Sequence, residues 1–337
     1  MNSKSDNYIL VTGGAGFIGA HLVNYLVKHG EKVIVLDDLS GGFIENVNTN
    51  ASFIKGSITD KELVNAIFEE NNIQYVFHLA AYAAEGLSHF IRRFNYTNNV
   101  LGSVNLINAS IKNEVKCFVF TSSIAVYGEN QLPMSEEMDP LPEDPYGIAK
   151  YAVELDLKAA NKQFGLNYII FRPHNVYGEF QNIGDRYRNV IGIFMNQILQ
   201  DKPLTIFGDG NQIRAFTYIN DIIPAISNSI HLKQYYNDIY NIGSDKTYTV
   251  KQVAREVMHA MKKDVPINYL AARNEVKYAY SSHDKLRNTY NKYLTNDTPL
   301  NIGIQSMADW VKRIGSRAST EFRNIELRKN LPESWRH

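Results

Sequence analysis

A tyrosine and a lysine four residues apart, Tyr146 and Lys150, have side chains suited to moving a proton on and off an alcohol. Both stand at the start of a predicted helix, where residues at this spacing share one face. A free phenol has a pKa of about 10, too high for a base at neutral pH, but a neighbouring ammonium favours the phenolate. The chain has 21 tyrosines, so this spacing is expected about once by chance and decides nothing alone.

A run of three hydroxyl residues, Thr121 to Ser123, ends a short apolar segment ahead of that helix. In doubly wound α/β sheets, ligands bind outside the carboxyl ends of the strands. A hydroxyl in that place can orient a substrate alcohol beside the phenol. We therefore predict that Ser123, Tyr146 and Lys150 are the catalytic residues.

A glycine-rich segment from Gly13 to Gly19 follows the first predicted strand and opens the first predicted helix. Gly13 allows a tight turn, Gly16 lets the backbone approach a diphosphate, and Gly19 lets the helix pack closely against the strand. Asp37 ends the second predicted strand about twenty residues later, where a carboxylate binds the hydroxyls of an adenosine ribose. This carboxylate would repel the 2′-phosphate of NADP, so the segment predicts a site for NAD.

The elements that position these residues alternate along the first half of the chain. Short segments rich in Val, Ile, Phe and Tyr predict buried strands at 8–12, 32–36, 52–55, 75–79, 117–122 and 167–171. Longer amphipathic segments predict helices at 17–29, 60–70, 90–112 and 146–164. This alternation predicts an α/β fold with a Rossmann-type doubly wound parallel sheet, which we assign to residues 1–174 as an NAD-binding domain.

The second half is less regular and predicts a smaller lobe over residues 175–319 that binds mainly the substrate. We expect a helix near 190–199 and strands at 204–208 and around 215–219, with segments near 215–243 returning to the main sheet. Thr249 and Gln252 form a possible capping box for a helix to about Met261. Residues 320–337 have the composition of a polar C-terminal tail.

Composition and charge exclude several classes of protein. The 337 residues predict two domains or one large α/β unit, and 35 basic residues balance 35 acidic ones. We therefore expect no binding to nucleic acid or to an anionic membrane surface. Cys117 is the single cysteine and the nine histidines are scattered, so we predict no disulfide and no metal site. The chain has no long apolar run and no signal-peptide pattern at residues 1–7, which favours a cytoplasmic protein.

Several further motifs occur in the order found in one superfamily. The glycine segment, Asp37-Asp38-Leu39, His78-Leu79-Ala80-Ala81, residues 122–128 and residues 146–150 resemble the extended short-chain dehydrogenase/reductases. Residues 172–178 and 208–214 are similar to the nucleotide-sugar epimerase/dehydratase branch. Within it the chain most resembles the NAD-dependent UDP-hexose 4-epimerases of the UDP-galactose (UDP-glucose) 4-epimerase type.

The resemblance implies a role for each matching residue. Tyr146 would be the catalytic base and acid, Lys150 its electrostatic partner, and Ser123 the hydroxyl that orients the 4-OH of the sugar. The matching cofactor positions are Gly13, Gly16, Phe17, Ile18, Gly19, Asp37, Asp38, Leu39, Ser40, Gly42, Ser57, Ile58, Leu79, Ala80, Ala81, Ala83, Asn99, Tyr146, Lys150 and His174. The matching nucleotide-sugar positions are Ser123, Asn175, Asn189, Val190, Thr205, Ile206, Phe207, Arg214 and Arg273.

The chain departs from the family pattern at positions that bear on the ligands. Ser57-Ile58 stands where the family often has an acid that contacts adenine. Ala83 stands where the epimerases have a lysine, which removes a cation from the site. Ala279 aligns with a bulky residue of some UDP-hexose epimerases, and this exchange leaves room for an N-acetyl group.

The residues after Ser123 distinguish the possible reactions. Ile124-Ala125 replaces the Asp-Glu pair of the 4,6-dehydratases. This stretch also lacks the glutamate of the UDP-glucuronate decarboxylases and the cysteine of the GDP-mannose 3,5-epimerases. What remains is chemistry that needs only hydride transfer and alcohol deprotonation. The resemblance thus implies epimerisation at C4 through a transient 4-keto sugar, of UDP-glucose and UDP-galactose or of the N-acetylhexosamine pair.

Three alternatives stay open at this point. The first is a UDP-glucuronate 4-epimerase, the second is another nucleotide-sugar epimerase or a reductase, and the third is a non-catalytic NAD-binding regulator. The intact set of Ser123, Tyr146 and Lys150 argues against the regulator, which does not need them. By resemblance, the predicted helices at 90–112 and 146–164 would pair with a second copy in a homodimer.

Overall fold

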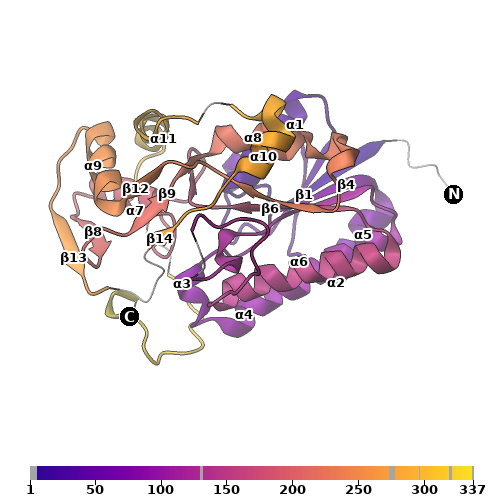
Figure 1. The fold of residues 1–337 in the computed structure, drawn as a ribbon, viewed down its shortest axis with the longest axis horizontal. Coiled ribbons are helices and arrows are strands. Elements are labelled where there is room, and N and C mark those ends of the chain that lie inside the picture. Colours follow the sequence, from indigo (N-terminus) through magenta and orange to yellow (C-terminus); the bar gives the residue numbers. More distant parts are fainter. Residues whose placement is uncertain (1–5, 130–131, 273–277, 296, 319–320, 336–337) are drawn as a thin grey trace.

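A seven-stranded parallel sheet forms the centre of the computed structural model, which describes residues 6–129, 132–272, 278–295, 297–318 and 321–335 (Figure 1). The strands are β1 (Asn7–Thr12), β2 (Val33–Asp37), β3 (Ser52–Lys55), β4 (Asn72–His78), β5 (Cys117–Thr121), β6 (Tyr168–Pro173) and β11 (Asp238–Ile242). Their order is β11-β6-β5-β4-β1-β2-β3, with every neighbouring pair parallel. The predicted Rossmann-type α/β fold is therefore confirmed, with β11 from the second half of the chain at the sheet edge.

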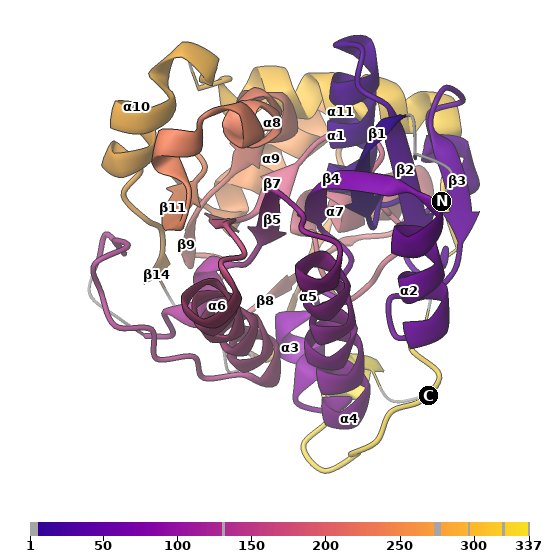
Figure 2. The same ribbon diagram turned by 90° about the vertical axis from the view of Figure 1, so that its right-hand side faces the viewer.

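Helices cover both faces of this sheet, as Figure 2 shows. On one face lie α1 (Phe17–Lys28) and α8 (Ile219–Asn228), and on the other α2 (Lys61–Glu70), α5 (Gly102–Lys112) and α6 (Pro145–Phe164). Neighbouring residues of one strand therefore enter different cores: Val11 packs with the α1 side, and Leu10 with the α2 side. Strands buried on both faces read as continuous apolar segments, which is why the sequence located them well.

The second lobe is built on two small sheets and three helices at the left of Figure 1. Its helices are α7 (Val190–Leu199), α9 (Val250–Met261) and α11 (Leu300–Ile314). Its strands are β8 (Leu204–Phe207) with β13 (Ile267–Leu270), and β9 (Ile213–Ala215) between β12 (Thr247–Thr249) and β14 (Tyr278–Ala279). The capping box is confirmed, because Thr249 Oγ1 accepts from the Gln252 amide at 3.2 Å and Gln252 Oε1 accepts from the Thr249 amide at 2.8 Å.

The helix predicted at 90–112 is present from Arg92 to Lys112, but it contains a π-helical turn. It consists of α4 (Arg92–Tyr96), a π-helical turn η2 (Thr97–Leu101) and α5, and a short helix α3 (Glu85–Ser88) precedes it. Asn99, within η2, uses its side chain to bond the backbone of Tyr82, and the hydroxyl of Ser103 donates to the Asn99 carbonyl at 2.6 Å. Side-chain bonds of this kind compete with the regular helical pattern.

The strand predicted around 215–219 is observed in part, as two short strands. β9 ends at Ala215, and β10 (Thr217–Tyr218) pairs with β7 (Val176–Tyr177) before α8 begins at Ile219. The helix α8 is not among those predicted from the sequence, although its buried residues Ile219, Ile222, Ile223 and Ile226 recur at helical spacing. A further helix, α10 (Asp284–Tyr290), packs near β11.

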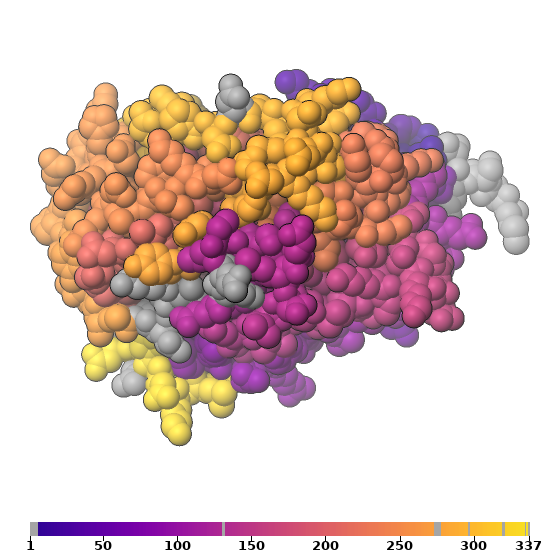
Figure 3. Space-filling model, viewed as in Figure 1, coloured from indigo at the N-terminus to yellow at the C-terminus, as the bar shows by residue number. Residues whose placement is uncertain are grey.

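The C-terminal residues 321–335 differ from the polar tail expected from composition. Phe322, Ile325, Leu331 and Trp335 join an apolar cluster with α3 and α4. Glu326 accepts hydrogen bonds of 2.8 Å from the amides of Arg93 and Phe94 in the first turn of α4. In Figure 3 the yellow C-terminal residues lie along the lower edge of the molecule, beneath the orange second lobe. None of the helices in the described part of the chain is both long and apolar enough to cross a membrane.

Candidate active site

A cavity of about 1670 Å³ opens where the carboxyl ends of the central strands face the second lobe. Its wall includes residues that follow β1, β4 and β5, and residues from β8 and β9. Pockets for one drug-sized ligand usually have about 300–1,000 Å³. This cavity therefore has room for two ligands side by side, at the position where doubly wound sheets bind them.

The glycine-rich turn forms one end of the cavity. Gly13 has a φ of +73°, and a Cβ there would lie 2.7 Å from the Ala80 amide nitrogen. A Cβ on Gly19 would lie 2.1 Å from the Gly13 carbonyl oxygen, so α1 could not pack against the turn. Gly16 is the N-cap of α1 and lines the cavity with Phe17 and Ile18. Free N–H groups and the helix dipole at this end suit the diphosphate of a dinucleotide.

Asp37 stands at the end of β2 on the same wall. Its carboxylate accepts hydrogen bonds from the amides of Ala15 at 3.0 Å and Leu39 at 2.8 Å. Burial raises the pKa of this carboxyl, and these two hydrogen bonds oppose the rise. Each carboxylate oxygen has more than one acceptor position, so Asp37 can still receive ribose hydroxyls.

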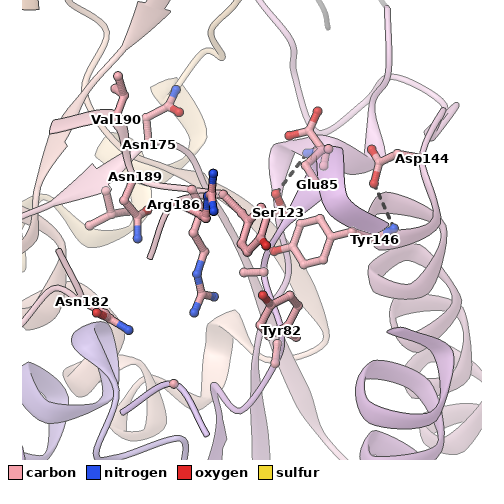
Figure 4. A pocket seen from close by; sticks show the side chains of 18 of the residues that line it. Tyr82, Glu85, Ser123, Asp144, Tyr146, Asn175, Asn182, Arg186, Asn189 and Val190 are labelled. Atoms are coloured by element: carbon pink, nitrogen blue, oxygen red, sulfur yellow. Dashed lines mark hydrogen bonds between the residues drawn. The ribbon is translucent and has the colours of Figure 1, made fainter. Parts of the chain in front are cut away.

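The three predicted catalytic residues line the cavity at the end of β5 and the start of α6. Figure 4 shows two of them, Ser123 and Tyr146. Ser123 caps a short turn, η3 (Ile124–Val126), and its hydroxyl accepts from the Ala125 amide at 3.1 Å. The Lys150 ammonium lies 5.8 Å from the centre of the Tyr146 ring. Asp144 caps α6 by accepting from the amides of Tyr146 at 2.9 Å and Gly147 at 3.0 Å, which fixes the turn that carries the phenol.

The charges around Tyr146 act in opposite directions. Burial raises the pKa of its phenol, and the carboxylates of Asp144 and Glu85 raise it further, whereas a hydrogen bond with Ser123 and the charge of Arg188 lower it. Burial also lowers the pKa of Lys150 to about 7. Burial thus disfavours the charged form of both groups, so the phenolate depends on the positive charge of Lys150 beside it.

A buried ion pair supports the end of β5 from behind the cavity. Arg172 donates to the two carboxylate oxygens of Glu154 at 2.9 and 2.5 Å, and both side chains are at most 1% exposed. Glu154 also accepts from the Ser122 hydroxyl at 2.5 Å, and Arg172 donates to the Tyr127 hydroxyl at 2.7 Å. This network holds the backbone on both sides of Ser123.

Most of the predicted ligand positions lie on the cavity wall. These are Gly13, Gly16, Phe17, Ile18, Gly19, Asp37, Asp38, Ser40, Gly42, Ser57, Ile58, Leu79, Ala80, Ala81, Ala83, Tyr146, Lys150 and His174 on the cofactor side, and Ser123, Asn175, Asn189, Val190, Thr205, Ile206, Phe207 and Arg214 on the sugar side. Arg273 lies outside the described residues. In Figure 4, Asn175, Asn189 and Val190 stand across the cavity from Ser123 and Tyr146.

Two predicted cofactor positions, Leu39 and Asn99, do not line the cavity. Leu39 has a φ of +62° and supports Asp37 through its amide. Asn99 is buried, and its side chain accepts from the Tyr82 amide at 2.9 Å and donates to the Tyr82 carbonyl at 3.2 Å. We therefore infer that both residues position the cavity wall, because their polar groups form hydrogen bonds with neighbouring residues of the protein.

His174, expected near the nicotinamide, lines the cavity but is only 3% exposed. Its Nε2 atom lies 3.0 Å from Nε2 of His283, whose Nδ1 atom lies 2.7 Å from Asp245. Burial and the neighbouring His283 lower the pKa of His174 to about 3. His174 is thus a neutral residue of the cavity wall, and its side chain is held in place by its contact with His283. Among the described residues no group of three metal-ligating side chains occurs.

Sequence reasoning missed several residues that the structure brings to the cavity. Glu85, Arg186 and Arg188 line it, and Figure 4 shows Arg186 between the sugar-side asparagines and Tyr82. Lys329, Asn330 and Trp335 of the C-terminal segment line it as well. Two arginines in one loop, 179–189, were the available signal, but no local pattern indicates how this loop lies against the cavity.

A Rossmann-type sheet with a dinucleotide cradle and a Ser-Tyr-Lys set beside it defines an NAD-dependent enzyme of the extended short-chain dehydrogenase/reductase class. The chain belongs to the NAD dependent epimerase/dehydratase family, whose model matches residues 9–243. It is an enzyme of the kind that acts on nucleotide sugars, and NAD is its cofactor.

Individual relatives include both epimerases and dehydratases. The chain is 35% identical to a UDP-glucose 4-epimerase of Halalkalibacterium halodurans, over 73% of this chain and 78% of that one. It is also 35% identical to a dTDP-D-glucose 4,6-dehydratase of Dictyostelium discoideum, over 77% of this chain and 64% of that one.

Solved structures of UDP-glucose 4-epimerases have the same fold. The enzyme of Thermotoga maritima, with UDP-glucose, superposes with a TM-score of 0.85 at 35% identity, covering 91% of this chain and 99% of that one. The enzyme of Thermus thermophilus, in complex with NAD, gives a TM-score of 0.83 at 30% identity, covering 90% and 99%.

Proposed function

We propose that this protein epimerises a UDP-hexose at C4. The observation that carries the proposal is the convergence of Ser123, Tyr146 and Lys150 on a cavity with room for a dinucleotide and a nucleotide sugar. The likeness to UDP-glucose 4-epimerases supports the choice of substrate class. The predicted sugar-side residues Asn175, Asn189 and Arg214 lie on the opposite wall and suit the polar groups of a nucleotide diphosphate.

The chain's own residues supply the proton chemistry of this reaction. Tyr146, as the phenolate, takes the proton of the 4-OH directly or through Ser123, and the positive charge of Lys150 stabilises the phenolate. NAD, when bound, supplies a reversible hydride acceptor for C4. Contacts to the nucleotide keep the 4-keto sugar in the cavity while it turns to present its other face, so binding energy from remote groups is used for positioning. C4 then regains the hydride on its opposite face, and Tyr146 returns the proton to the oxygen.

Dehydration fits the wall less well. Ile124 and Ala125 directly follow Ser123 and line the cavity, and neither can transfer a proton. Removal of water from a sugar needs an additional acid and base at the carbon atoms concerned. The reaction proposed here needs only the phenol, the hydroxyl and the ammonium.

The sugar itself is either the glucose/galactose pair or the N-acetylhexosamine pair. Ala279 lines the cavity in β14 and pairs with Arg214 of β9, and its small side chain leaves space for an N-acetyl group. UDP-glucuronate is the alternative substrate, although the charge of Arg186 on the cavity wall is paired with Glu321.

One experiment tests both the reaction and the substrate. The purified protein is incubated with UDP-glucose, UDP-N-acetylglucosamine and UDP-glucuronate without added cofactor, and the C4 configuration is followed by proton NMR. We expect conversion of at least one substrate, because NAD is regenerated in each turnover. Tyr146→Phe should abolish it. Turnover that requires stoichiometric NAD(H) would indicate a net reductase, and unchanged turnover by Tyr146→Phe would refute the assigned role.

A further inference from the structure

Arg188 reaches from the loop before α7 across the cavity wall. Its Nε atom donates to Asp185 at 2.6 Å, and its side chain is 20% exposed. The guanidinium lies 5.1 Å from the centre of the Tyr82 ring. At its far end, a terminal nitrogen lies 3.3 Å from the point where a Cβ on Gly41 would stand. A residue of the second lobe thus touches the loop that follows Asp37.

The groups around the guanidinium belong to the cofactor half of the cavity. Gly41 lies in the segment expected around the adenosine ribose, and Tyr82 follows Ala80 and Ala81 at the end of β4. The glycine turn and the N-terminus of α1 offer N–H groups to a diphosphate from one side. Ala83, on the same wall, provides no cation. Arg188 brings a positive charge to that half of the cavity from the second lobe.

We propose that Arg188 binds the diphosphate of NAD from the side opposite the glycine turn. Asp185 uses Nε of the guanidinium, so NH1 and NH2 are the nitrogens that would meet the phosphate oxygens. Two N–H groups of one guanidinium match two oxygens of a phosphate, which a lysine cannot do. This proposal rests on the cofactor and stands apart from the identity of the sugar.

The loop that carries Arg188 is fastened on its outer side by the C-terminal segment. Arg186 pairs with Glu321 at 2.9 Å, and the Phe322 amide donates to the Tyr187 hydroxyl at 3.2 Å. The Tyr187 and Trp335 rings lie 5.2 Å apart. These contacts hold the loop before the cofactor binds, which reduces the entropy lost on binding. Asn189 follows Arg188 directly, so one loop serves both ligands.

The test compares Arg188→Gln and Arg188→Lys with Arg317→Gln as the matched control. Arg317 is 19% exposed, pairs with Glu45 at 3.3 Å and stacks on Phe43 at 3.5 Å, so it resembles Arg188 in burial and partners near the same loop, but it does not line the cavity. NAD is removed from each purified protein, and the dissociation constants of NAD, ADP-ribose and adenosine are measured by isothermal titration calorimetry. Release of NAD from the untreated proteins is measured alongside.

We expect Arg188→Gln to raise the dissociation constants of NAD and ADP-ribose by about tenfold or more, as for the loss of a charge-assisted hydrogen bond. The dissociation constant of adenosine should stay within about twofold of the wild-type value. Arg188→Lys should recover part of the loss, and Arg317→Gln should resemble the wild type. Equal weakening of adenosine would reduce Arg188 to a structural role and overturn the proposal. Unchanged NAD affinity, with or without weaker UDP binding, would overturn it too. If Arg188→Gln does not fold, Arg188→Lys decides, since the loss of bidentate contact alone should weaken NAD more than adenosine.

Discussion

The ammonium of Lys150 donates a 2.7 Å hydrogen bond to the carbonyl oxygen of Thr121, the last residue of β5. This bond ties the first turns of α6 to the strand that leads to Ser123. The lysine is 3% exposed and also lies 4.7 Å from the centre of the Phe120 ring. A single side chain therefore fixes the distance between the two elements that carry the phenol and the hydroxyl, and it supplies the local positive charge.

Lys150→Met should reduce turnover by about 10²–10⁴-fold, because the phenolate of Tyr146 loses its stabilising charge.

The amine has a pKa lowered to about 7 by burial, against about 10.4 when unfolded, so the unfolded state binds more protons between these values. The wild type is thus penalised at neutral pH and regains stability as the pH rises toward 10. Urea unfolding at several pH values measures the free energy of unfolding of the wild type and of Lys150→Met. As the pH rises over that range, the wild type should gain stability relative to the variant. A pH-independent difference would contradict the buried amine.

Two buried histidines should make the fold sensitive to acid. Burial lowers the pKa of His78 and of His174 to about 3, and both are buried by their neighbours in the fold. The unfolded state, with a histidine pKa of about 6.5, binds more protons below that value, so stability is lost as the pH falls from about 6.5 toward 3. Each histidine should lower the free energy of unfolding at pH 5 by about 2 kcal/mol relative to its value above pH 6.5.

The variant His174→Gln isolates one of these contributions. It should show a weaker fall in unfolding free energy between pH 7 and pH 5 than the wild type. His231→Gln, at a side chain that is 52% exposed, is the control and should keep the wild-type slope. Identical slopes for the wild type and His174→Gln would show that His174 is protonated in the folded protein.

Breaking the buried pair of Glu154 and Arg172 should strongly destabilise the fold. Arg172→Met leaves the Glu154 carboxylate without its partner in a site with no exposed surface, and such losses cost about 3–5 kcal/mol. The double variant Glu154→Leu with Arg172→Met should recover much of this, because it removes both charges. Chemical denaturation of the three proteins provides the measurement. A double variant no more stable than Arg172→Met would show that the cost is lost packing.

Removal of the C-terminal segment should weaken substrate binding more than turnover. Truncation after Ala318 exposes the cluster around Leu87, Ile91 and Phe94 and deletes cavity residues that include Lys329 and Trp335. We expect a lower melting temperature and a KM for the nucleotide sugar raised severalfold, with kcat less affected, since the catalytic residues lie on β5 and α6. Trp335→Ala should reproduce part of the effect, and Arg328→Ala, at an exposed position, should not.

We propose that the protein forms a homodimer through α5 and α6, which lie side by side in Figure 2. Leu101, Ile148 and Leu155 are 52, 39 and 47% exposed, and Ile148 and Leu155 share one face of α6. Light scattering should give a dimer mass for the wild type and a monomer mass for Leu155→Glu. Ile302→Glu, on an exposed site of α11, is the control and should stay dimeric. A monomeric wild type at micromolar concentration would rule out the interface.

The sequence by itself determined the local features of this protein. Apolar runs located the sheet strands, because strands buried on both faces show no polar interruption, and the spacing of Gly13, Gly16 and Gly19 indicated the cofactor turn. The same local reasoning missed α8, although its isoleucines recur at helical spacing, and it did not indicate the π-helical turn η2, where Asn99 and Ser103 bond the backbone through their side chains.

Only the tertiary structure decided which distant residues meet. Composition suggested that the C-terminal residues are polar, but Phe322 and Trp335 pack against an apolar surface on α3 and α4. No local pattern in the sequence indicates this contact. The contact of Arg188 with Tyr82 and Gly41 depends on how the second lobe rests on the sheet. Periodicity records which face of an element is buried, and the partner on that face is fixed by the packing of the whole chain.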